Sequence, residues 1–435
     1  MTPNTTPTRA VYLDHAATTP MDPHVVDAMR PYFIEEYGNP SSLYAAGRSA
    51  KEAIDHARRM VATVLQCHPE ELVFTGSGTE SDNMAVLGIA RYHRARGNHL
   101  LVSAIEHHAV LGAAEHLRKE GHVLDVLPVD QDGVVDPAQV RAALRPETTL
   151  VSVMMANNEI GTIEPIHEIA KTIREWKQEH GRKPNDPPFF HTDACQAAGA
   201  CALALPKLGV DLLTINGAKI YGPKGTGALY IRRGVRLEPL VYGGGQEHRL
   251  RSGTEHVAGI VGFATALEIA EACRVPESVR LSHLRDQLIA GIVQRVPKIV
   301  LNGHPTNRLP NNVNVSILDI EGEAMLLYLD AYGIAAATGS ACDSQSLDPS
   351  HVILAIGHPY EYAHASIRFT LGRSTTEEDI AYVLDVLPGI VEKLRKISPV
   401  RLEMGQQRCA VGSGAASATV SAFAGQGRPH WEQRK

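Results

Sequence analysis

The sequence of 435 residues has few of the features that mark secreted, membrane-bound or disulfide-stabilised proteins. Its six cysteines are widely scattered and form no C-x-x-C pair, which argues against a disulfide framework. No uncharged apolar run approaches the roughly 18 residues that a membrane helix needs. The N-terminus lacks the basic start and apolar core of a signal peptide. We therefore expect a cytoplasmic protein with no membrane partner.

The chain also has no excess of basic residues over acidic ones. The formal net charge is −6, so we expect no direct nucleic-acid binding. Hydrophobic residues make up 44% of the chain and charged residues 21%, as in ordinary globular proteins. This length is enough for one large domain and a smaller one.

From Glu71 onwards, short apolar strands alternate with helical stretches. This pattern is typical of an α/β fold with a mostly parallel sheet, here of seven strands, covered on both faces. In such sheets, ligands bind beyond the carboxyl ends of the strands. The expected strands are Leu72–Thr75, Leu100–Ala104, Val123–Val129, Thr149–Met155, Phe189–Thr192, Leu212–Ile215 and Ala228–Ile231, and the expected helices between them are Glu80–Arg94, Ala109–Lys119, Pro137–Leu144 and Ile166–Glu179.

The last third of the chain has a different character and predicts a smaller α+β domain. We expect two separate helices, Val257–Cys273 and a second around Val279–Val293, and a final helix opened by a capping box of Thr375 and Glu378. The predicted units are a disordered N-terminus (1–9), a large domain (17–265), a small domain (10–16 and 266–398) and a disordered tail (399–435).

A glycine-rich turn, Gly76 to Ser81, follows the first strand of the alternation and opens a helix. Backbone N–H groups at a helix N-terminus can bind phosphate when glycines allow a close approach. The motif is neither a P-loop nor G-x-G-x-x-G, so it does not indicate a nucleoside triphosphate or NAD. A plain tight turn is the alternative interpretation.

Polar residues follow three later strands: His107 after Glu106, Asn158 after Asn157, and Asp193. The adjacent His107 and His108 suggest a metal, but no further ligands stand at metal-site spacing, so we expect no metal. An imidazole stacked on a planar cofactor is the alternative. An acidic residue at a strand end can keep a pyridine nitrogen protonated, although Asp193 could equally be a helix N-cap.

Two further residues stand out by their surroundings. Lys219 lies on a glycine-rich loop just after a buried strand, where a lysine can form a Schiff base with a carbonyl cofactor. Cys342 is the one cysteine in a Gly/Ser-rich stretch, and such a setting favours a reactive thiolate over a buried structural thiol. A solvated loop lysine is the plain alternative for Lys219.

These motifs, in this order, resemble the NifS/IscS-like cysteine desulfurases, a branch of the fold-type I enzymes that depend on pyridoxal 5′-phosphate (PLP). The resemblance covers about residues 11–397. It rests on Leu13 to Pro20, Gly38 to Ser42, Gly78 to Asn83, Glu106-His107, Asn157 to Gly161, Asp193 to Gln196, Lys219 to Gly225 and Arg251 to Thr254.

The resemblance implies a role for each matching residue. Lys219 would bind PLP as a Schiff base and move the Cα proton, His107 would stack on the ring, and Asp193 would pair with the ring nitrogen. The remaining implied cofactor residues are Gln196 and Asn158 at the phenolic oxygen, and Gly78, Thr79, Asn216 and, from the other subunit of a homodimer, Thr254 at the phosphate.

On the substrate side, the resemblance implies that Arg368 and Asn158 bind the carboxylate of L-cysteine. Cys342 would attack the substrate sulfur, releasing alanine and leaving a persulfide. The sulfur would then pass to an acceptor protein for iron–sulfur cluster assembly, tRNA thiolation or DNA phosphorothioation.

The chain departs from the family around Lys219 itself. Common members carry Ser-Gly-His-Lys where this chain has Asn216-Gly217-Ala218-Lys219. Losing one hydrogen bond to the phosphate would cost about 1.5–3 kcal/mol, so we expect weaker PLP binding. A selenocysteine or cysteine sulfinate lyase, or a non-catalytic sulfur-transfer partner that binds PLP weakly, are the alternatives.

Overall fold

The computed structural model describes residues 9–339, 349–399 and 402. Cys342, most of the predicted N-terminal disorder and most of the predicted tail therefore lie outside the described residues. Arg9, at the start of the described part, pairs with Asp379 at 2.6 Å. In this part of the chain, no helix is long and apolar enough to cross a membrane.

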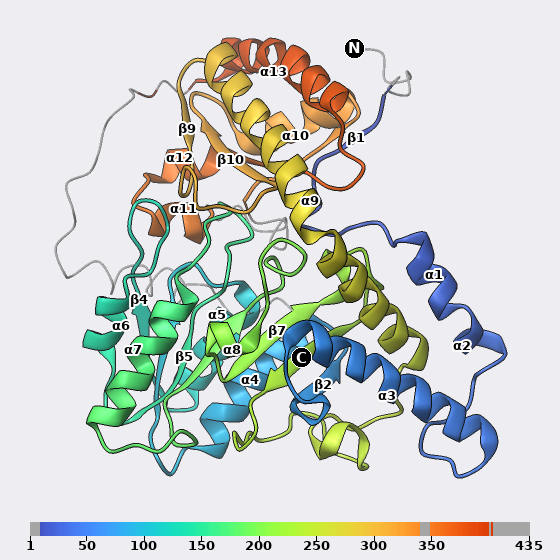
Figure 1. The fold of residues 1–435 in the computed structure, drawn as a ribbon. Helices are drawn as coiled ribbons and strands as arrows, with labels where there is room; N and C mark the ends of the chain where they lie inside the picture. The colour runs from blue at the N-terminus through green and yellow to red at the C-terminus, as the bar shows by residue number, and fades with distance from the viewer. Residues whose placement is uncertain (1–8, 340–348, 400–401, 403–435) are drawn as a thin grey trace, which may run out of the picture.

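A seven-stranded sheet organises the larger part of the molecule, in the order β2-β8-β7-β6-β5-β3-β4 (Figure 1). The neighbours from β7 to β4 are parallel, and β8 is antiparallel to both β2 and β7. The predicted mostly parallel sheet is confirmed. The strands are β2 (Leu72–Thr75), β3 (His99–Ser103), β4 (Val123–Leu127), β5 (Thr148–Ser152), β6 (Phe189–Asp193), β7 (Leu212–Asn216) and β8 (Gly227–Ile231).

Both faces of this sheet are covered, because successive strand residues point to opposite sides. Phe190 and Leu213 belong to one apolar core, and the adjacent Phe189 and Leu212 belong to another. Helices α4 and α5 cover the second face, while α3 and α7 pack on the first. The helices of this part are α1 (Pro23–Met29), α2 (Pro31–Ile34), α3 (Ala45–Leu65), α4 (Gly78–Tyr92), α5 (His108–Lys119), α6 (Pro137–Ala143), α7 (Ile166–Glu179) and α8 (Leu205–Leu208), with the 3₁₀ helices η1 (Pro69–Glu71), η2 (Gly217–Lys219) and η3 (Gln246–Arg249).

The smaller part has its own core around an antiparallel sheet in the order β12-β10-β9. The N-terminal strand β1 joins this part, because it pairs with β11. The elements are β1 (Val11–Tyr12), β9 (Ile299–Leu301), β10 (Asn312–Ile317), α10 (Gly322–Ala331), β11 (Ile334–Ala335), α11 (His351–Ala355), α12 (Tyr360–His364), β12 (Ser366–Thr370) and α13 (Glu377–Ile397).

Two predictions in this region need correction. The two helices expected around Cys273 and Val279 are one helix, α9 (Val257–Arg295), which links the two parts in Figure 1. Pro276 lies inside it; a proline removes one backbone hydrogen bond, but packing against both cores holds the helix on either side. The capping box of α13 is Thr376 with Asp379, one residue later than expected.

Candidate active site

The predicted site residues of the large part lie at the carboxyl ends of neighbouring strands. Asp193 ends β6 and is 5% exposed. Its Oδ1 atom accepts a hydrogen bond from the backbone N–H of Cys195 at 2.8 Å. This bond turns the chain after β6 and fixes the direction of the carboxylate. A turn and not a helix follows Asp193, so this residue is not the helix N-cap of the alternative interpretation.

A buried polar layer lies around Asp193. His191 contacts Ser152 Oγ through Nδ1 at 2.9 Å and Thr214 Oγ1 through Nε2 at 3.1 Å. Burial lowers the pKa of His191 to about 4, so the imidazole is neutral at pH 7. Burial and the nearby Asp193 raise the pKa of Asp82 well above its usual value, which favours its uncharged form. Asp82 therefore does not add a buried negative charge beside Asp193.

Lys219 lies at the end of η2, directly after β7. Its Nζ atom donates to the carbonyl oxygens of Ala16 at 2.8 Å and Ala17 at 2.5 Å. Gln196 Nε2 donates to the same Ala16 oxygen at 2.9 Å. Lys219 follows β7 and Gln196 follows β6. Both side chains bind the same carbonyl oxygen of the N-terminal segment, so the structure brings them together. The solvated loop lysine is the wrong interpretation.

The glycine-rich turn forms the start of α4, which Ser77 caps by accepting from Glu80 N at 3.1 Å. A Cβ atom on Gly78 would lie 2.8 Å from Cys195 Sγ and 3.4 Å from Asn216 Nδ2. Only glycine fits there, and the amide nitrogen of Asn216 lies beside the helix N-terminus. The other amide atom, Oδ1, accepts from Ala218 N at 2.8 Å.

His107 is the N-cap residue of α5. Its Nδ1 atom accepts from Ala109 N at 3.1 Å, so the neutral ring carries its proton on Nε2. The preceding Glu106 binds Ser103 Oγ and Met154 N at 2.6 Å each, and burial raises its pKa to about 7. Within the described ranges, no cluster of three or more His, Cys, Asp or Glu residues could hold a metal ion.

Arg368 supplies the site from the smaller part of the molecule, and it is 2% exposed. Its guanidinium donates to the Asn158 carbonyl oxygen at 3.0 Å and to Asp14 Oδ1 at 2.9 Å. The Nε atom of Arg368 is buried without a hydrogen-bond partner. The predicted pair of Arg368 and Asn158 is thus brought together. Asp14 was missed as a site residue, although it lies in a motif that the sequence singled out.

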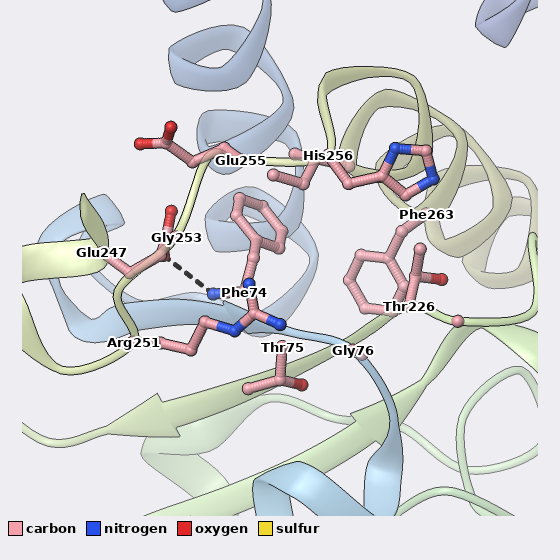
Figure 2. A pocket seen from close by; sticks show the side chains of 13 residues that line it. Phe74, Thr75, Gly76, Thr226, Glu247, Arg251, Gly253, Glu255, His256 and Phe263 are labelled. Carbon is pink, nitrogen blue, oxygen red and sulfur yellow. Dashed lines mark hydrogen bonds between the residues drawn. The ribbon is translucent and has the colours of Figure 1, made fainter. Parts of the chain in front are cut away.

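Thr79 and Thr254 are exposed and lie at the surface. A hollow lined by Gly76, Arg251, Gly253 and Glu255, among others, lies at the residues on either side of Thr254 in the sequence (Figure 2). Arg251 Nε donates to Glu80 Oε1 at 2.8 Å, and Glu80 Oε2 accepts from Gly76 N at 2.9 Å. These two contacts tie the segment before Thr254 to the start of α4.

The class-V aminotransferase family matches residues 11–383 of the sequence. The chain belongs to this family. It is 49% identical over 395 residues to the cysteine desulfurase IscS of Dictyoglomus turgidum, covering 91% of this chain and 98% of the relative. The predicted membership in the NifS/IscS-like branch is confirmed.

Solved structures agree with this assignment. A NifS-like protein superposes with a TM-score of 0.82 at 35% identity, covering 89% of this chain and all of that one. SspA in complex with cysteine gives a TM-score of 0.72 at 32% identity, covering 83% of this chain and 99% of that one. The predicted fold, a fold-type I PLP-dependent transferase, is confirmed by these likenesses.

Enzymes of this family depend on PLP, and the site residues fit that cofactor. The close packing at Gly78 leaves backbone N–H groups of α4 and the Asn216 amide for an anionic phosphate. Asp193, in a layer of neutral neighbours, suits a protonated pyridine nitrogen. Ala218 adds no side-chain donor at the position where common members of the family carry histidine.

Proposed function

We propose that the chain converts L-cysteine to L-alanine and keeps the sulfur as a persulfide on Cys342. The observation that carries this proposal is the convergence of two reactive groups on one short segment. Asp14 pairs with Arg368, while the carbonyl groups of Ala16 and Ala17 accept from Lys219. An amine and a guanidinium from different parts of the chain are therefore held close to one another.

Bound PLP supplies an electron sink that stabilises negative charge at the substrate Cα. Asp193 would hold the ring nitrogen protonated, with Gln196 and Asn158 near the phenolic oxygen. His107 would lie against the ring, with its proton on Nε2. Gly78, Thr79 and Asn216 would bind the phosphate. Lys219 would anchor the cofactor and carry the Cα proton.

Arg368 would bind the substrate carboxylate. A guanidinium offers two parallel N–H donors that match a carboxylate, which a lysine cannot do. The unpartnered Nε atom and the present partner, the Asp14 carboxylate, support this role. The substrate carboxylate would replace Asp14 or share the fork with it.

Cys342 would attack the substrate sulfur as a thiolate. The Cβ–S bond of the substrate breaks, an S–S bond forms on Cys342, and a proton takes the place of sulfur on Cβ. The sulfur is oxidised to the persulfide level as Cβ is reduced to a methyl group. One cysteine and one thiol thus give one alanine and one persulfide, and no outside oxidant or reductant is needed.

We further propose a cytoplasmic homodimer in which Thr254 reaches the phosphate of the neighbouring subunit. Exposed apolar side chains support a surface that a second subunit covers, because monomeric proteins rarely expose large apolar patches. Five such side chains lie within a short stretch of the sequence: Phe33 (58% exposed), Ile34 (73%), Tyr37 (78%), Leu43 (91%) and Tyr44 (62%). The sulfur acceptor would be a scaffold or carrier protein of iron–sulfur cluster assembly, tRNA thiolation or DNA phosphorothioation.

The test is to incubate the purified protein with PLP and L-cysteine and to measure alanine and protein persulfide. We expect wild type to form both, Lys219→Ala to form neither, and Cys342→Ser to lose the persulfide but keep PLP absorbance. Alanine release by Lys219→Ala at the wild-type rate would contradict the proposal. Faster turnover of selenocysteine or cysteine sulfinate in the same assay would favour the related lyase instead.

A further inference from the structure

In strand β10, polar and apolar side chains alternate. Such alternation is typical of a strand with one face in water. Here both faces are buried: the apolar face belongs to the core of the smaller part, and Asn312 and Asn314 on the other face are each 0% exposed. A buried side-chain amide costs free energy unless its hydrogen bonds are made, so the partners of these two asparagines explain why the face is polar.

Both asparagines reach across to the larger part of the molecule. Asn312 Nδ2 and Asn314 Nδ2 each donate to the carbonyl oxygen of Glu159 at 3.1 Å. Glu159 directly follows Asn158 in a tight turn, and Asn158 is one of the two residues proposed at the substrate carboxylate. The smaller part therefore holds the backbone of the turn that carries Asn158.

Two further contacts hold the same turn. Arg308 Nη2 donates to the carbonyl oxygen of Ile160 at 2.9 Å, again from the smaller part. A Cβ atom on Gly161, whose φ is +79°, would lie 2.8 Å from Asn312 Cγ, so only glycine allows this close approach. On the opposite side, Asn157 Oδ1 accepts from the N–H of Ile160 at 2.9 Å. The turn is thus held from both parts of the molecule.

Arg368, the other residue proposed at the substrate carboxylate, stands next to these asparagines. Strand β12 is antiparallel to β10, and Arg368 is the register partner of Asn314. Directly opposed side chains of an antiparallel pair lie on the same face of the sheet. Arg368 Nη1 donates to the Asn158 carbonyl oxygen at 3.0 Å, one residue before the carbonyl group that Asn314 binds. Two adjacent strands therefore hold two successive carbonyl groups of one turn.

We propose that Asn312 and Asn314 are positioning residues that fix Asn158 relative to Arg368, and so set the geometry of the carboxylate-binding site. The inference rests on the proposed function, because it assigns the substrate carboxylate to Arg368 and Asn158. The two amides act through the Glu159 carbonyl group, as a supporting layer behind the residues that bind. Substrate binding, and not cofactor binding, is the step that depends on them.

The first test compares Asn314→Ala with Ser316→Ala as PLP-loaded full-length proteins. Ser316 is a matched control, because it is equally buried in β10 but its Oγ donates to the Tyr362 carbonyl oxygen within the smaller part. We expect Asn314→Ala to raise KM for L-cysteine about tenfold, with kcat near the wild-type value. PLP absorbance should be unchanged, and Ser316→Ala should keep the wild-type KM.

L-alanine separates binding from turnover, because it has the same carboxylate and is not consumed. Its dissociation constant, from the absorbance change on binding, should rise about tenfold in Asn314→Ala. A general loss of structure would weaken PLP binding together with L-alanine binding. Asn312→Ala, which removes the other donor to the same carbonyl oxygen, should give the same result and keeps the test decisive if Asn314→Ala does not fold.

A second readout follows the turn itself and needs neither cofactor nor substrate. Deuterium exchange of the backbone N–H groups of residues 157–163, measured by mass spectrometry on the apoprotein, should be faster in Asn314→Ala than in wild type. The reason is that the turn loses one of the hydrogen bonds that keep it closed. Ser316→Ala should exchange at the wild-type rate in this segment.

Combining Asn314→Ala with Arg368→Lys tests whether the asparagine acts through the carboxylate site. If Asn314 fixes Asn158 relative to the guanidinium of Arg368, its loss should matter little once that guanidinium is gone. We expect the double variant to bind L-alanine at most about threefold more weakly than Arg368→Lys alone, whereas independent effects would add a further factor of about ten.

A wild-type KM in Asn314→Ala and Asn312→Ala, or a rise matched by Ser316→Ala, would overturn the inference. Unchanged exchange of residues 157–163, or the full further loss in the double variant, would overturn it as well. Failure of the proposed function gives a different result: the wild-type protein would form no alanine from L-cysteine. The exchange measurement would still decide in that case whether the asparagines hold the turn.

Discussion

The cofactor side and the substrate side of the site are built in different ways. On the cofactor side, Asp193 and Lys219 stand at adjacent strand ends of one sheet, over the buried layer of His191 and Thr214. On the substrate side, Arg368 meets Asp14 and Asn158, which lie 354 and 210 residues away in the chain. The first side depends on one sheet, and the second depends on how two cores pack together.

This difference predicts where substitutions are tolerated. A sheet with a core on each face holds its strand ends regardless of the small part, so the cofactor side should keep its geometry when the substrate side is disturbed. The substrate side has less support, because the contact of Arg368 with Asn158 crosses from one part of the molecule to the other. Cofactor binding and substrate binding should therefore separate experimentally.

Arg368→Lys is the strongest way to break the substrate side alone. A lysine keeps the charge but cannot donate two parallel hydrogen bonds, so we expect kcat/KM for L-cysteine to fall about a hundredfold. PLP absorbance should be unchanged. The matched control is Arg285→Lys, another buried arginine, which donates to the Leu309 carbonyl oxygen outside the site. An equal loss in both variants would contradict a specific role for Arg368.

The sequence predicted where Asp193, Lys219 and Gly78 lie in the sheet, because these signals are local. Asp193, Lys219 and Gly78 each follow a recognisable apolar strand, and parallel strands bring their carboxyl ends to one edge. The family motifs added Gln196, Asn158 and Arg368, which local pattern alone leaves unconnected.

Contacts between side chains far apart in the sequence could not be predicted. No pattern in the sequence ties Glu159 to Ser350, 191 residues later, or Arg368 to Asp14. Such contacts depend on tertiary packing, which periodicity does not encode. The same limit explains helix α9: Pro276 suggests a break by local rules, but the packing of two cores holds the helix together.

His191 provides a pH test of the cofactor side. Its pKa is about 4 in the folded protein and about 6.5 in an unfolded chain, so the unfolded state binds more protons between these values. Its contribution to stability is present above pH 6.5 and is lost as pH falls toward 4, by about 3 kcal/mol in total. Denaturant unfolding of wild type and His191→Gln at pH 7 and pH 4.5 measures this.

We expect the free energy of unfolding to fall less with pH in His191→Gln than in wild type. Other buried groups titrate in both proteins, and Glu106, with a raised pKa of about 7, acts in the opposite direction. Comparing the two proteins removes these shared contributions. Equal pH slopes would show that His191 is not held neutral by its burial.

Next to Lys219, the chain carries Ala218 where common family members carry histidine. Restoring the histidine should strengthen PLP binding. Asn216 Nδ2 already lies beside the start of α4, so most of the deficit should come from Ala218. Ala218→His should raise PLP affinity by about tenfold, because a second donor would reach the phosphate. Titration of the apoprotein with PLP measures the effect. Unchanged affinity in Ala218→His would show that the missing imidazole does not limit cofactor binding.

The smallest expected effect distinguishes two buried aspartates, Asp82 and Asp193. Burial and Asp193 favour the uncharged form of Asp82, so Asp82→Asn replaces one neutral polar group by another. We expect its PLP affinity and alanine formation to change by less than about threefold. Asp193→Asn removes a charge that the pyridine nitrogen needs and should lose far more activity. Equal losses in the two variants would mean that both carboxyls act as a charged pair, and that the layer around the cofactor is not neutral.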